Sequence, residues 1–90
     1  MARGEISWTR RSAEGLKVQV YAHSEGDRWR FFIRERRFDR WLSLAAPPLE
    51  DWRELLDAVE RRIDRRLVRP EEADRLRRTI HEQFPEVMLP

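Results

Sequence analysis

The spacing of apolar residues changes at Pro47-Pro48 from a period of two to a helical period, and this change most constrains the fold. Before the prolines, apolar and polar residues alternate, which is typical of half-buried strands. After them, apolar residues recur three or four positions apart, as on one face of a helix. The sequence therefore predicts an α+β fold in which the strands precede the helices.

The clearest alternation lies in residues 16–23 and 28–34, which flank the turn-forming segment 24–27. The first stretch has its apolar residues at even positions and the second at odd positions. An antiparallel hairpin in which His23 pairs with Arg28 brings the two apolar faces together, whereas a slip by one residue would set apolar against polar side chains. We therefore predict a register in which the paired residue numbers sum to 51.

Two further strands are expected beside this hairpin. A strand at about 5–12 connects through Ala13-Glu14-Gly15, which suits a type I turn closed by a glycine with positive φ. Trp8 then pairs with Val20 on the apolar face, so that residues 16–23 form a central strand. A short strand is also expected near 40–44, which gives an antiparallel sheet of three to four strands.

Helices are predicted over about 48–66 and 70–84, followed by a short C-terminal tail. We expect the sheet half (5–44) and the helical half (48–84) to form one domain over residues 1–90, with two helices covering one face of the sheet. The expected core residues come from both halves: Trp8, Val20, Trp29, Phe31, Trp52, Leu56, Val59 and Leu76.

The other face of the predicted sheet combines cations with aromatic rings. Its expected members are Lys17, Gln19, Tyr21, His23, Arg28, Arg30, Phe32 and Arg34. Aromatic and Arg enrichment is typical of protein interfaces, so we expect a protein-interaction or self-association module, with a protein partner or homodimer. The alternative is a single-stranded RNA or DNA module, in which bases stack on rings and cations contact phosphates.

Charge and composition leave both hypotheses open. The chain has 18 Arg but only one Lys, and its formal net charge is +2. Residues 1–41 hold 10 basic and 6 acidic groups, a net of +4, whereas residues 42–90 hold 9 and 11, a net of −2. The arginine excess has a compositional explanation as well as a functional one.

Few residues are suited to catalysis or to ligand binding. The chain has no cysteine, only His23 and His81 as imidazoles, and three scattered glycines, so no nucleophile–base set or phosphate loop is evident. We expect no enzyme activity, no catalytic residues, no metal site, no cofactor and no small-molecule ligand. No secretory signal or apolar membrane span is evident either, and a cytoplasmic location is expected.

Overall fold

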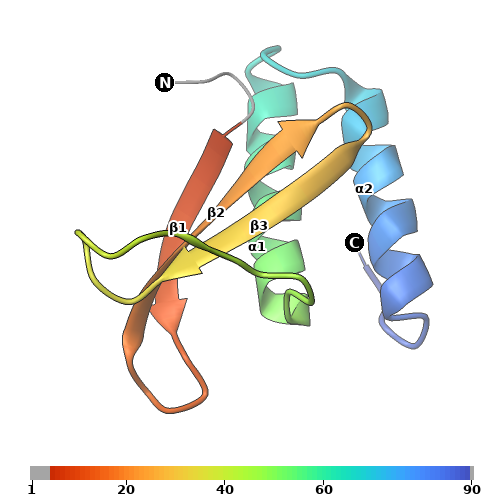
Figure 1. The fold of residues 1–90 in the computed structure, drawn as a ribbon. Coiled ribbons are helices and arrows are strands. Elements are labelled where there is room, and N and C mark those ends of the chain that lie inside the picture. Colours follow the sequence, from red (N-terminus) through yellow and green to blue (C-terminus); the bar gives the residue numbers. More distant parts are fainter. Residues whose placement is uncertain (1–4, 90) are drawn as a thin grey trace. The chain divides into compact units, whose positions relative to one another are not determined.

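The structure is a computed structural model that describes residues 5–89. The chain divides into two compact units, Met1–Pro47 and Pro48–Pro90. The first holds a four-stranded antiparallel sheet and the second holds two helices (Figure 1). The α+β class and the order of strands before helices are therefore confirmed. That one domain spans both halves, with helices covering one sheet face, stays a prediction.

The sheet has the strand order β1-β2-β3-β4, and each strand is antiparallel to its neighbour. Its strands are β1 (Glu5–Arg11), β2 (Lys17–Glu25), β3 (Arg28–Arg34) and β4 (Leu42–Ser43). The fourth strand expected near 40–44 is thus present, but it has only two residues. It is anchored to β3 by the Leu44 amide, which donates a 2.8 Å hydrogen bond to the Phe31 carbonyl.

The first hairpin has the register expected from the sequence, with Trp8 opposite Val20. The Ser12 amide donates to the Leu16 carbonyl over 2.7 Å, and the Gly15 amide donates back to the Ser12 carbonyl over 2.9 Å. Gly15 has a φ of 84°, which glycine adopts without a steric penalty. The turn is therefore the type I turn with a closing glycine that the sequence predicts.

The register predicted for the second hairpin is wrong by two residues. His23 pairs with Arg30 rather than with Arg28, and the paired numbers sum to 53. The strands continue to a Glu25–Arg28 pair, so the loop is Gly26-Asp27 alone, and Gly26 has a φ of 65°. A two-residue turn with glycine first suits a twisted hairpin, and it adds backbone pairs that the four-residue loop would lose.

The inner face of the sheet carries Val18, Val20, Ala22 and Phe31, which are all buried. The two-residue shift keeps every side chain on its predicted face, because successive residues of a strand point to opposite sides. The Trp8 ring meets the Phe31 ring edge to face, with centroids 6.1 Å apart. Trp8 itself is half-buried, as is Trp29, so the predicted core is less complete at the sheet than expected.

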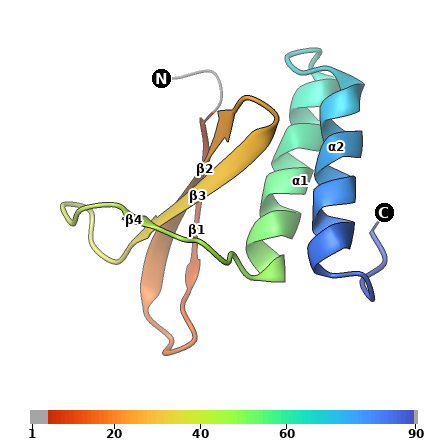
Figure 2. The ribbon, with the colours of Figure 1, turned by 45° about the vertical axis from the view of Figure 1, so that its right-hand side comes forward.

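The helical unit consists of α1 (Leu49–Asp64) and α2 (Pro70–Gln83), which pack antiparallel (Figure 2). Both begin near a proline, which helices accept in the first turn, and both have acidic residues in that turn. Their buried side chains follow the predicted apolar stripes, with Trp52, Leu56 and Val59 on α1 and Leu76 on α2. These four members of the predicted core are confirmed as buried.

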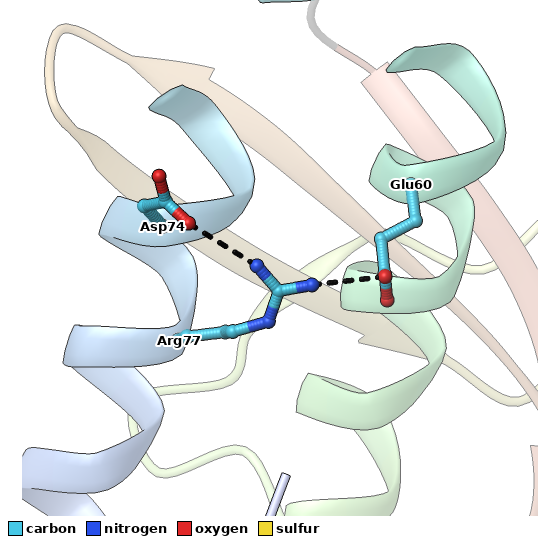
Figure 3. A network of polar contacts seen from close by, with 3 residues as sticks. All are labelled: Glu60, Asp74 and Arg77. Atoms are coloured by element: carbon cyan, nitrogen blue, oxygen red, sulfur yellow. Dashed lines mark hydrogen bonds and ion pairs between the residues drawn. The ribbon is translucent and has the colours of Figure 1, made fainter. Parts of the chain in front are cut away.

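Backbone hydrogen bonds close the C-terminal end of α1, and an ion pair links α1 to α2. Arg66 takes a φ of 60° after α1, and its amide donates to Ile63 while the Leu67 amide donates to Arg62, as in a Schellman motif. Arg77 of α2 contacts Glu60 of α1 at 2.9 Å and Asp74 at 3.3 Å (Figure 3). The guanidinium thus links the two helices.

Candidate interaction face

The eight residues singled out from the sequence lie on one face of the sheet, opposite Val18, Val20 and Ala22. We call this the outer face. Lys17, Gln19, Tyr21 and His23 alternate along β2, and Arg28, Arg30, Phe32 and Arg34 alternate along β3. The observed register forms rows across the strands, namely His23–Arg30, Tyr21–Phe32 and Gln19–Arg34. The sequence-based register had instead placed Arg30 beside Tyr21 and Phe32 beside Gln19.

Three aromatic rings gather at the centre of the outer face. Tyr21 and Phe32 are stacked, with centroids 4.7 Å apart and an interplanar angle of 19°. Trp41 meets Tyr21 edge to face, with centroids 4.6 Å apart. Two nearly parallel rings at this separation must overlap face to face, since rings lying side by side in one plane would collide. Each of the two stacked rings therefore covers one face of the other, and all three side chains are half-buried.

Two arginines cover further ring surface. The Arg34 guanidinium carbon lies 4.2 Å from the centre of the Trp41 ring, and Arg34 Nε donates a 2.7 Å hydrogen bond to Gln19 Oε1. The Arg30 guanidinium carbon lies 5.4 Å from the Phe32 centroid. Arg30 is also 3.6 Å from a Glu25 carboxylate oxygen, but both side chains are more than half exposed, so solvent screens that pair.

The remaining members of the outer face are less constrained. Lys17 and Arg28 are exposed near the ends of their strands. His23 is half-buried, and its Nδ1 is shielded from solvent with no hydrogen-bond partner among residues 5–89. The face therefore has an ordered centre and an exposed cation at each end.

Trp41 was not identified from the sequence, although it belongs to the aromatic centre. It immediately precedes β4, in which Leu42 pairs with Ile33 and Ser43 with Phe32. Alternation alone places Trp41 on the same face as Ser43, and hence on the outer face. The place of Trp41 on the outer face thus requires the pairing of Ser43 with Phe32, which the local pattern does not predict.

The outer face offers side chains of the kinds that binding surfaces use. Rings and guanidinium groups supply contact area, cation–π contacts and hydrogen-bond donors, whereas the residues of the outer face include no nucleophile paired with a base. Within the described part of the chain, no three His, Asp or Glu side chains come together as a metal site. Among the same residues, neither helix has the length and apolar character to cross a membrane.

Comparisons with protein-family models, with curated proteins and with solved structures find no match to this chain.

Proposed function

We propose that the protein is a non-catalytic interaction module that binds an acidic segment of a partner protein through its outer face. The observation that carries this proposal is the ordered aromatic centre, in which the Tyr21 ring contacts both Phe32 and Trp41 and Arg34 covers Trp41. Rings and arginines that are already held in place lose little side-chain entropy on binding. Such pre-ordered aromatic and Arg side chains are the usual hot spots of protein interfaces.

The charge of the outer face supports an acidic partner rather than a second copy. Four of its eight residues are cationic, and of these Arg30 pairs with an acid, Glu25. In an isologous dimer through this face, the two basic surfaces would oppose each other and repel. An acidic segment would instead complement the face and be attracted to it over several ångströms.

The arrangement of the rings disfavours the alternative, single-stranded nucleic acid. Platforms for unpaired bases present open aromatic faces on which successive bases stack. In the stack of Tyr21 on Phe32, each ring covers one face of the other, while Arg34 occupies a face of Trp41. The basic groups remain compatible with phosphate, so an oligonucleotide titration belongs in the test.

A photo-crosslinking residue in place of Ser7, next to Tyr21 on the outer face, tests the proposal in the cells that make the protein. A second crosslinker in place of Glu54, which is exposed on α1, is the positional control. The protein captured through Ser7 is then purified, and its affinity is measured by calorimetry. We expect Phe32→Ala to weaken binding by at least about thirtyfold, the size of a hot spot of about 2 kcal/mol.

Phe38→Ala is the matched control for that measurement, because Phe38 is 93% exposed and lies in the loop between β3 and β4. It should leave the affinity within about twofold of the wild type. Equal affinities for the Phe32→Ala and Phe38→Ala proteins would contradict the proposal. Outer-face amide shifts with a single-stranded oligonucleotide that fade as salt rises would favour the nucleic-acid alternative instead.

A further inference from the structure

The Arg34 side chain is held from two directions on the outer face. Its Nε–H donates to Gln19 Oε1 over 2.7 Å, and its guanidinium carbon lies 4.2 Å from the Trp41 ring centre. The hydrogen bond fixes one edge of the planar group and the ring supports one of its faces. A guanidinium that is already positioned loses less freedom when it binds a ligand.

The edge of Arg34 that carries Nη1 and Nη2 has no partner within the described residues. A guanidinium has five N–H donors. Within the described residues Arg34 makes one hydrogen bond, and its donor is the Nε–H. Arg30, Arg61, Arg75 and Arg77, in contrast, each contact a carboxylate. Arg34 is half-buried, and a cation withdrawn from water without an anionic partner is unfavourable.

The end of the outer face that holds Arg34 is basic. Beyond the row Thr9–Gln19–Arg34, the next row of the outer face pairs Arg11 with Lys17. Neither row contains an acidic side chain, and Lys17 is exposed. This end of the face therefore attracts anions, whereas at the opposite end Glu5 and Glu25 reduce the positive charge.

We propose that Arg34 is a carboxylate-binding site that receives a Glu or Asp side chain of the acidic partner segment. The inference rests on the proposed function and names the contact that anchors the partner. With Nε committed to Gln19, the two parallel N–H groups of Nη1 and Nη2 donate hydrogen bonds to the two oxygens of one carboxylate. Lys17 and Arg11 strengthen the attraction without fixing the geometry. Gln19 and Trp41 are positioning residues, because they act through Arg34.

The probe for this site is a short blocked peptide rich in Glu, compared with the same peptide in which every Glu is replaced by Gln. Binding is measured by calorimetry, and the site is followed through the NMR signal of the Arg34 Nε–H. We expect the Glu peptide to shift that signal, and the Gln peptide to bind at least about tenfold more weakly. This comparison uses the wild-type protein, so it does not depend on the folding of a variant.

Two Arg→Lys variants, which keep the positive charge, distinguish binding by a positioned guanidinium from binding by a general basic surface. Arg34→Lys retains the cation but lacks the planar fork, and we expect about a tenfold loss of affinity for the Glu peptide. Arg78→Lys is the matched control, because Arg78 is exposed on α2 and does not belong to the outer face, and it should stay within about twofold of the wild type. Gln19→Ala, which releases one edge of the guanidinium, should fall between them.

The outcomes distinguish this inference from the proposed function. If the Glu peptide binds with equal affinity to the Arg34→Lys and Arg78→Lys proteins, the Arg34 site is wrong while an acidic partner on the outer face still stands. Absence of Glu-peptide binding at low salt overturns the carboxylate site, and the crosslinking experiment then decides the proposed function alone. Stronger displacement of the Arg34 signal by inorganic phosphate or an oligonucleotide than by the peptide also overturns the site.

Discussion

Replacing Phe31 by alanine should destabilise the sheet unit severely. The side chain is 3% exposed, lies on the inner face of β3 opposite Ala22, and meets the Trp8 ring edge to face. Because its neighbour across the strands is already an alanine, no large side chain directly opposite can move into the space. The substitution therefore leaves a cavity rather than a repacked core.

The magnitude follows from the buried ring. Loss of a fully buried Phe side chain costs about 1.5–3 kcal/mol of transfer free energy, and the residual cavity raises the total to about 3–5 kcal/mol. Small domains have total stabilities of only about 5–15 kcal/mol. At roughly 4–8 °C per kcal/mol for a chain of this size, the melting temperature should fall by roughly 12–40 °C.

Urea unfolding followed by circular dichroism and tryptophan fluorescence measures this loss. Phe38→Ala is the control, since it removes the same side chain from a site that is 93% exposed and should change the free energy of unfolding by no more than about 0.5 kcal/mol. If Phe31→Ala prevents folding, Phe31→Leu provides a smaller and measurable loss. Equal unfolding free energies for the Phe31→Ala and Phe38→Ala proteins would refute the assignment of Phe31 to the inner face.

Three smaller effects on the free energy of unfolding are expected. Gly26→Ala should cost about 1 kcal/mol because of the positive φ in the hairpin turn, and a loss no larger than that of Asp27→Ala would argue against a strained turn. Arg66→Gly should instead stabilise the chain by about 0.5–1 kcal/mol, since a non-glycine residue closes α1 in the left-handed region; an unchanged urea midpoint would contradict this. Arg77→Ala should cost about 0.5–1 kcal/mol by breaking its contact with Glu60, and the difference should shrink at about 1 M salt, where the Debye length is roughly 3 Å; a salt-independent loss would exclude an ionic cause.

The period of the sequence predicts which face of a strand is buried, but it does not fix how two strands align. Pairing of His23 with Arg28 or with Arg30 leaves every apolar side chain of the hairpin on the same face, because the two registers differ by two residues. The turn decides between them. Gly26 accepts the positive φ of a tight two-residue loop, whereas the turn-forming residues 24–27 as a group are equally compatible with a four-residue loop.

In the first hairpin, the alternation and the turn together predict the observed register. Gly15 there closes a loop whose length matches its turn type, so the alternation and the turn chemistry agree on one pairing. Trp41 shows the opposite situation. Its segment has only two strand residues, and its place on the outer face depends on the pairing of Ser43 with Phe32, which is a contact distant in sequence. Local patterns therefore predict such residues poorly.

The two-residue shift in register also changes the functional interpretation of the outer face. Had Tyr21 been paired with Arg30 and Phe32 with Gln19, each ring would have lain beside a polar side chain, open to a nucleic-acid base. In the observed register the two rings are direct neighbours and stack. The neighbour of Gln19 is then Arg34 rather than the Phe32 ring, and the two side chains form a hydrogen bond. The Gly26-Asp27 turn sets this register, so it both covers ring surface on Tyr21 and Phe32 and places Arg34 where Gln19 can hold its guanidinium. The loss of stacking surface supports the proposed protein ligand over an unpaired nucleic acid, whereas the ordered guanidinium suits a carboxylate or a phosphate equally.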